Sequence, residues 1–193
     1  LRTGEAVRAP ALGPVACWVT EVRGGNVFVR EKAVPTPVSR VAPAPGWPQR
    51  IVVIGGGAAG FAAAEMLRRQ RFQGGIVMLS DDDAPPVDRP NLSKDYLAGS
   101  APEEWVPLRG DDFYTEQGID LRLKTTVARI DVRAQEVVLD DGSRVAYDRL
   151  LIATGAEPVR LPLPGMDLPH VHTLRTLGDC RAIIARAATT LRA

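Results

Sequence analysis

Residues 51–60 read IVVIGGGAAG, an apolar run followed directly by glycines in the spacing G-x-G-x-x-G. Four consecutive branched apolar residues suit a parallel strand that is covered on both faces. Gly55, Gly57 and Gly60 allow a tight turn, a close approach of a pyrophosphate and close packing of the following helix. Free N–H groups at the start of that helix stabilise a diphosphate. The stretch therefore predicts a dinucleotide-binding turn.

The residues after this turn complete a β-α-β unit. Small and apolar residues recur at helical spacing from Ala58, and we expect that helix to end at Gly74 and Gly75. A second apolar strand is expected at 76–79. Asp81 follows the third glycine by 81 − 60 = 21 residues, close to the roughly 20 expected for a ribose-binding acid.

Composition limits the classes of protein to which the chain can belong. The 193 residues are 45% hydrophobic and 24% charged with a net charge of +1, as in a globular protein of one domain plus part of another. The near-neutral charge argues against a nucleic-acid partner. No apolar run approaches the roughly 20 residues that span a bilayer, and no signal-peptide pattern is visible, so we expect no membrane contact and a cytoplasmic location.

Cysteine and histidine usage gives no sign of a redox dithiol or a metal site. Cys17 and Cys180 lie far apart and form no C-x-x-C, so buried free thiols are expected. His170 and His172 would share one face of a strand, but they lack a third ligand type nearby. The two aspartates after Asp81 are expected in a solvated acidic loop, and no metal is assigned.

The chain divides into three parts by pattern. Residues 1–32 are expected to be β, with strands at 18–22 and 27–29. Five prolines between 33 and 49 favour an extended linker. Residues 51–193 are expected to form an α/β domain.

Several further elements are expected within this domain. Ser93 suits a helix N-cap, and a short helix is expected over 111–117, ended by Gly118. A β-meander is expected over 119–123, 127–132, 135–139 and 143–147, followed by an apolar strand at 149–152.

An amphipathic helix is expected from Thr176 to Ala193. Asp179 stands at the capping-box position, and no glycine or proline closes the helix. We therefore expect the chain to be a fragment from which a further domain is missing.

Three motifs in order resemble one flavoprotein family. The β-α-β unit, the meander and a strand ending Ile152-Ala153-Thr154-Gly155-Ala156 resemble the FAD domain of flavoprotein reductases with two dinucleotide domains. Residues 88–94, DRPNLSK, resemble the D-R-P-x-L-S-K signature of the ferredoxin reductase and apoptosis-inducing-factor-like branch. The resemblance covers 51–193 and implies an FAD-binding, Rossmann-like α/β fold with an inserted β-meander.

The same resemblance implies the residues that bind FAD. They are Gly55, Gly57, Ala58, Ala59, Gly60, Asp81, Arg89, Lys94, Val127, Ala153, Thr154 and Gly155. Arg89 would contact the adenosine and diphosphate side, Val127 the adenine, and Lys94 the reactive edge of the flavin as the catalytic residue. Val87 departs from the family pattern, in which tyrosine is common.

The first residues resemble a second family. Residues 1–11, LRTGEAVRAPA, are similar to the segment that follows the second cluster-binding box of Rieske-type ferredoxin domains. Those domains hold a [2Fe–2S] cluster with two Cys and two His, which would all lie upstream of Leu1. The resemblance implies that 1–32 is the C-terminal remnant of such a domain.

Together the resemblances imply the FAD-binding portion of an NAD(P)H-dependent oxidoreductase. Electrons would pass from nicotinamide via FAD to an iron–sulfur centre in cis. No second G-x-G-x-x-G follows Gly60, so NAD(P)H and the [2Fe–2S] cluster are expected only in a longer protein, and the chain itself is expected to be inactive. Two alternatives stay open: an NAD-binding Rossmann dehydrogenase fragment, and a non-enzymatic nucleotide-binding or interaction module.

Overall fold

The computed structural model describes residues 15–33 and 46–189 of the chain. The chain forms two compact units, residues 1–41 and 42–193. The Rieske-like stretch at 1–11 and most of the expected linker lie outside the described residues.

The first unit contains an antiparallel β-hairpin. Strands β1 (Trp18–Arg23) and β2 (Asn26–Lys32) confirm the two strands expected there. The turn between them holds Gly24 and Gly25 at φ values of 55° and 78°, which glycine adopts without strain. Several apolar side chains are exposed within the hairpin, namely Trp18, Val19, Val22, Val27, Phe28 and Val29. A lone two-stranded hairpin is marginally stable, so this one needs further packing partners.

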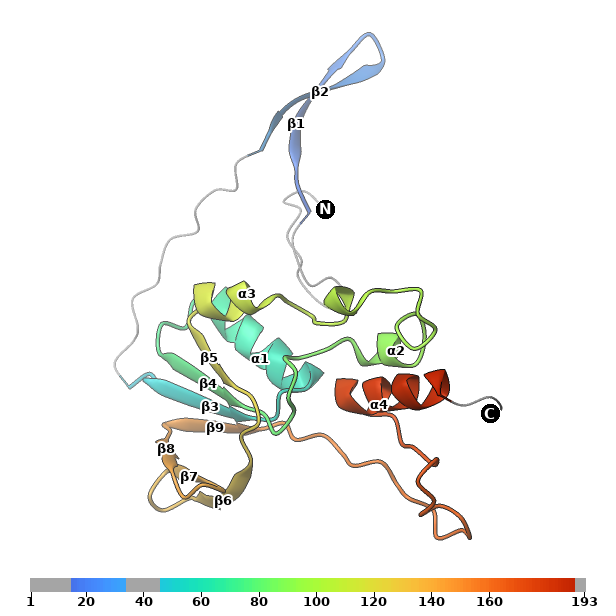
Figure 1. The fold of residues 1–193 in the computed structure, drawn as a ribbon. Coiled ribbons are helices and arrows are strands. Elements are labelled where there is room, and N and C mark those ends of the chain that lie inside the picture. Colours follow the sequence, from blue (N-terminus) through green and yellow to red (C-terminus); the bar gives the residue numbers. More distant parts are fainter. Residues whose placement is uncertain (1–14, 34–45, 190–193) are drawn as a thin grey trace. The chain divides into compact units, whose positions relative to one another are not determined.

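The second unit is built on a four-stranded parallel sheet (Figure 1), which confirms the predicted α/β fold. In sheet order the strands are β5 (Ile119–Arg122), β4 (Gly75–Leu79), β3 (Arg50–Ile54) and β9 (Arg149–Ile152). The prediction that 119–123 begins the meander was wrong, because β5 instead pairs in parallel with β4. An alternating apolar pattern identifies a strand but does not specify its partner.

Helix α1 (Ala58–Arg69) packs on one face of the sheet and buries Phe61 and Ala64. The prediction that Gly74 and Gly75 end this helix was wrong. The helix ends at Arg69 with Gln70 as its C-cap, and Arg71 takes the left-handed conformation at φ 64°. Gly74 instead allows the chain to pack closely against Gln49, because a Cβ there would lie 2.5 Å from the Gln49 carbonyl oxygen.

An antiparallel meander is present, as predicted, but it has three strands and covers the other face of the sheet. Its strands are β6 (Val127–Asp131), β7 (Glu136–Leu139) and β8 (Arg144–Ala146). Sheet and meander share one apolar core made of Val52, Ile54, Val77, Leu79, Val137, Leu139 and Val145. Both faces of β3 and β4 are therefore covered, which explains their uniformly apolar sequences.

The remaining helices are α2 (Arg89–Leu92), η1 (Glu103–Trp105), α3 (Asp111–Glu116) and α4 (Leu177–Ala188). The prediction of Ser93 as an N-cap was wrong, because α2 starts earlier and Ser93 follows its last residue. Pro90 lies in the first turn of α2, where its fixed φ favours a helix start. The predicted N-cap Thr176 and the ending of α3 near Gly118 are confirmed. No helix in the described ranges is long and apolar enough to cross a bilayer.

Strand β9 is one of the two edge strands of the sheet, the other being β5. Leu151 and Ile152 are 37% and 60% exposed. Beside them, β9, β3 and α1 enclose an apolar hollow of about 340 Å³ lined by Val53, Met66 and Leu150 among others. Within the described residues, nothing pairs with the outer edge of this strand.

Arg68, in the last turn of α1, connects the loop before β4 with the loop between α3 and β5. Its guanidinium donates to the carbonyl oxygens of Gln117 (2.6 Å), Gly118 (2.7 Å), Phe72 (2.7 Å) and Gly74 (2.9 Å). Burial lowers the pKa of Arg68, but its usual value is so high that the group stays charged. One side chain therefore satisfies carbonyls from two separate loops.

Replacement of Arg68 by alanine is expected to lower the free energy of unfolding by about 2–4 kcal/mol, because four carbonyls lose a charged donor. Chemical denaturation measures this change. Arg129→Ala is the matched control, since the side chain of Arg129 is 55% exposed and pairs only with Asp131 in the described residues. Equal stability of the two variants would contradict the role of Arg68.

Candidate nucleotide-binding site

The sheet topology places a crevice at the carboxyl ends of its central strands. The chain runs from β3 to β4 and β5 on one side, then returns as β9 on the other side of β3. Ile54 pairs with both Leu79 and Ile152, so the ends of the three strands lie level. Such a reversal of strand order is where open α/β sheets bind ligands.

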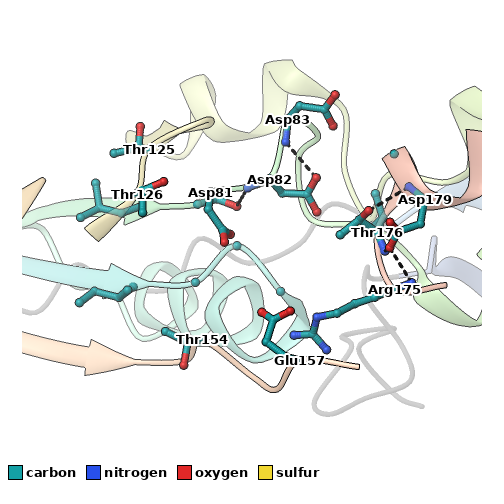
Figure 2. A pocket seen from close by; sticks show the side chains of 18 of the residues that line it. Asp81, Asp82, Asp83, Thr125, Thr126, Thr154, Glu157, Arg175, Thr176 and Asp179 are labelled. Atoms are coloured by element: carbon teal, nitrogen blue, oxygen red, sulfur yellow. Dashed lines mark hydrogen bonds between the residues drawn. The ribbon is translucent and has the colours of Figure 1, made fainter. Parts of the chain in front are cut away.

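A hollow of about 650 Å³ occupies this position (Figure 2). It is lined by six of the predicted residues: Gly55, Gly57, Asp81, Arg89, Val127 and Thr154. Ala58, Ala59 and Gly60 form the first turn of α1, and Ala153 and Gly155 flank Thr154. Lys94 is not among the lining residues; it is exposed in the turn after α2, beside Ser93, which lines an adjoining hollow.

Two glycines of the turn are required by contacts within the protein itself. Gly55 has a φ of 114°, and a Cβ there would lie 2.6 Å from the carbonyl carbon of Ala153. A Cβ on Gly60 would overlap the carbonyl oxygen of Gly55 and lie 3.1 Å from Val53 Cγ1. Neither position has space for a side chain.

Gly57 also lines the hollow, but no backbone atom would contact a side chain there. It is the N-cap of α1 with a φ of −79°, and no side chain caps the helix. No acidic residue occupies the first turn. A Cβ on Gly57 would meet only the end of the Arg89 side chain, 3.3 Å away. Uncapped amides, the helix dipole and a nearby guanidinium together suit an anionic group.

The opposite wall is acidic. Asp81, Asp82 and Asp83 follow β4, and Asp81 and Asp82 face the hollow in Figure 2. Asp82 was expected to be solvated but is partly buried, since its loop folds back into the wall. Burial raises the pKa of Asp82, the neighbouring Asp81 and Asp83 raise it further, and hydrogen bonds from the N–H groups of Asp83 and Ala84 oppose the rise.

The sequence analysis missed Glu157 and Arg175, which line both the main hollow and the adjoining one. Figure 2 shows Arg175 extending toward Glu157. Its guanidinium also comes within 2.8 Å of the place that a Gly155 side chain would take. Both residues lie in the long irregular segment between β9 and α4, where no periodic pattern marks a side chain as facing a site. The one sequence signal that could have indicated Arg175 is its position directly before the capping box of α4.

The start of α4 also borders the hollow, but, unlike the start of α1, it has a side-chain cap and an acidic residue in its first turn. Thr176 and Asp179 form a capping box, in which the Asp179 N–H donates to Thr176 Oγ1 at 3.0 Å. The Asp179 carboxylate accepts from the N–H groups of Arg175 and Thr176, both at 2.9 Å. Burial alone would raise the pKa of Asp179, but these hydrogen bonds outweigh it and lower the pKa.

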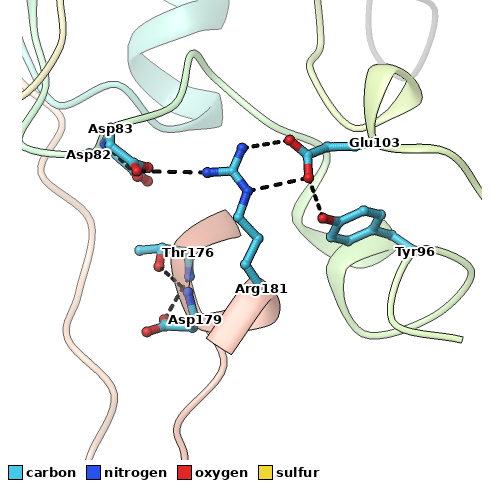
Figure 3. Close-up of polar contacts among 7 residues, drawn as sticks. All are labelled: Asp82, Asp83, Tyr96, Glu103, Thr176, Asp179 and Arg181. Carbon is cyan, nitrogen blue, oxygen red and sulfur yellow. Dashed lines mark hydrogen bonds and ion pairs between the residues drawn. The ribbon is translucent and has the colours of Figure 1, made fainter. Parts of the chain in front are cut away.

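A polar network holds α4 against this wall (Figure 3). Arg181 donates through two nitrogens to Glu103 and lies 3.7 Å from Asp83. The Tyr96 hydroxyl donates to the same Glu103 carboxylate. Arg181, and secondarily Tyr96, lower the pKa of Glu103. The network connects α4, η1 and the acidic loop.

Both cysteines are free thiols; Cys180 is buried as predicted, whereas Cys17 is only partly buried. Cys180 is fully buried, its thiol donates to the Leu92 carbonyl oxygen at 3.1 Å, and burial raises its pKa. A buried thiol with a raised pKa is a poor nucleophile.

The parallel sheet, with α1 on one face, the meander on the other and the hollow at its carboxyl edge, defines a Rossmann-like dinucleotide-binding fold. The chain belongs to the pyridine nucleotide-disulphide oxidoreductase family, whose profile matches residues 49–189.

Individual relatives are electron-transfer reductases. Rhodocoxin reductase from Rhodococcus erythropolis is 42% identical over 104 residues, which are 54% of this chain and 24% of that protein. Rubredoxin-NAD(+) reductase from Pseudomonas putida is 40% identical over 96 residues, or 50% of this chain and 25% of that protein. The chain therefore spans about a quarter of the length of these curated relatives.

A solved structure agrees with these relatives. The covalent complex of putidaredoxin reductase with putidaredoxin matches with a TM-score of 0.66 and 38% identity, covering 72% of this chain and 34% of that one.

The two kinds of glycine predict different results. Gly57→Ala should keep the free energy of unfolding within about 1 kcal/mol of the parent, because its φ suits alanine, yet lower nucleotide affinity at least about tenfold through the loss of close approach. Gly60→Ala should lower the free energy of unfolding by about 3 kcal/mol or more. Denaturation and calorimetric titration measure both. Equal stability of the two variants would contradict the distinction.

Proposed function

We propose that the hollow binds FAD. The main support for this proposal is that one continuous hollow is lined by the uncapped start of α1, by Asp81, and by Thr154 and Arg175. Its volume of about 650 Å³ lies in the range of small-molecule and cofactor sites. Membership of the pyridine nucleotide-disulphide oxidoreductase family supports the choice of a dinucleotide.

In this proposal, different residues around the hollow bind different parts of FAD. The amides at Gly57, Ala58 and Ala59 hold the diphosphate with Arg89, while Gly55 and Gly60 shape the turn. Asp81 accepts hydrogen bonds from the adenosine ribose, and Val127 lies at the adenine. Ala153, Thr154 and Gly155 approach the cofactor from β9.

We further propose that the chain is the FAD-binding portion of an NAD(P)H-dependent oxidoreductase of the ferredoxin reductase and apoptosis-inducing-factor-like branch. When bound, FAD would accept a hydride from a nicotinamide and pass single electrons to an iron–sulfur centre. The names of the relatives, which include rubredoxin and putidaredoxin reductases, support such an acceptor. The sequence signature at 88–94 supports the branch.

The domain organisation is part of the proposal: a Rieske-type remnant at 1–32, a proline-rich linker at 33–49 and the FAD domain at 51–193, with the iron–sulfur acceptor in cis. The exposed apolar side chains of the β1–β2 hairpin support its origin in a larger β domain. Free cysteines support a reducing, cytoplasmic compartment.

Equilibrium dialysis of the chain against FAD, FMN and NAD tests the assignment. Preferential retention of FAD is expected, because the hollow offers sites for a diphosphate, a ribose and a further ring system. Preferential retention of NAD would favour the dehydrogenase alternative. Binding of none of the three would favour an interaction module.

Asp81→Asn should weaken FAD binding about 10- to 150-fold, because a charged hydrogen bond contributes about 1.5–3 kcal/mol. Isothermal titration measures the change. Asp141→Asn is the matched control, since Asp141 lies on the turn between β7 and β8 and accepts from Ser143. An unchanged affinity in Asp81→Asn would place the ribose acid elsewhere.

Lys94→Ala should lower the reduction potential of bound FAD while FAD content stays nearly unchanged, because a cation near the flavin favours negative charge on its reduced form. Spectroelectrochemical titration measures the potential. Arg129→Ala controls for loss of one positive charge. The same potential in Lys94→Ala and the parent would show that Lys94 does not act on the flavin.

A further inference from the structure

Ser80 carries the only aliphatic hydroxyl in the buried core of the described residues, with 3% of its surface exposed. It follows β4 directly and lines the hollow. Its N–H donates to the Arg122 carbonyl oxygen at 2.9 Å, and its carbonyl oxygen accepts from the Thr125 N–H at 2.8 Å. These bonds fix the backbone of Ser80 against the strand β5 and the residues that follow it.

The Ser80 side chain contacts both walls of the hollow. Its Oγ accepts from the Asp82 N–H at 3.3 Å, which ties it to the acidic loop. Its Cβ lies 2.6 Å from the place that a Gly56 Cβ would take, and its Oγ is closer still. Gly56 is outside the left-handed region, so its backbone would accept a side chain. The Ser80 side chain alone excludes one there.

We propose that Ser80 is a positioning residue for the adenosine half of the site, an inference that rests on the proposed nucleotide binding. Asp81 lies between Ser80, whose backbone is fixed, and Asp82, whose N–H the Ser80 hydroxyl holds. The same side chain packs against the glycine turn at Gly56. Ser80 thereby sets the distance between the ribose-binding carboxylate and the diphosphate-binding turn.

Ser80→Ala tests the hydroxyl. ADP is the probe, because it carries only the adenosine and diphosphate half of the cofactor. With the loss of one hydrogen bond, ADP and FAD affinities are expected to fall about 2- to 12-fold and the melting midpoint by no more than about 6 °C. Ser143→Ala, on the turn between β7 and β8, should change neither affinity.

The outcomes separate the two proposals. A parent chain that binds neither ADP nor FAD would overturn the proposed function and this inference with it. A parent that binds both, with equal affinities in Ser80→Ala, would overturn the role of Ser80 and leave the proposed function standing.

A paired substitution tests the packing. Gly56→Ala should abolish ADP binding and lower the melting midpoint, because its methyl group overlaps the Ser80 side chain. Adding Ser80→Gly removes the Cβ and Oγ of residue 80, so that its Cα, 3.9 Å away, is the nearest atom to the new methyl group. ADP affinity and the melting midpoint of the double variant should then equal those of Ser80→Gly alone. Gly75→Ala is the control, because its nearest neighbour is 3.8 Å away. ADP binding that is not restored in the double variant would overturn the reciprocal packing.

Discussion

The domain depends on backbone contact at Gly55, where three parallel strands meet the start of α1. The Gly55 N–H donates to the Leu79 carbonyl oxygen, and the Ala153 N–H donates to that of Ile54, both at 2.8 Å. A Cβ at Gly55 would collide with Ala153, and one at Gly60 with Gly55. Because no side chain separates these backbones, the strand ends and the helix start are held in fixed relation, and the hollow takes its shape from them.

Two helices begin at this hollow, and their starts have different electrostatic character. The Thr176–Asp179 capping box binds the Asp179 and Thr176 N–H groups at the start of α4 and also brings a carboxylate to that end. The start of α1 has no side-chain cap and no acid in its first turn. The positive end of one helix dipole is therefore neutralised, while the other stays open to an anion beside Arg89. This asymmetry directs a diphosphate to the glycine turn.

Glycine spacing, apolar periodicity and the capping box were sufficient to predict that a β-α-β unit, a meander and the N-terminus of α4 are present. Each of these features depends on residues close together in the sequence. Such patterns failed where tertiary contacts decide. Helix α1 ends before the predicted Gly74 and Gly75, with Arg71 in the left-handed conformation and Arg68 bound to the carbonyls around that turn. The partner of β5 and the approach of Arg175 to the site are set by pairings distant in sequence, which no periodicity encodes.

The open edge of β9 has a consequence for the behaviour of the protein in solution. Its unpaired N–H and C=O groups, together with the exposed Leu151 and Ile152, form a template for strand addition. Natural proteins protect such edges with charges, prolines or bulges, but between Leu150 and Ile152 this strand offers only aliphatic side chains. Within the described residues this edge is therefore a surface for strand addition, and self-association through it rises with protein concentration.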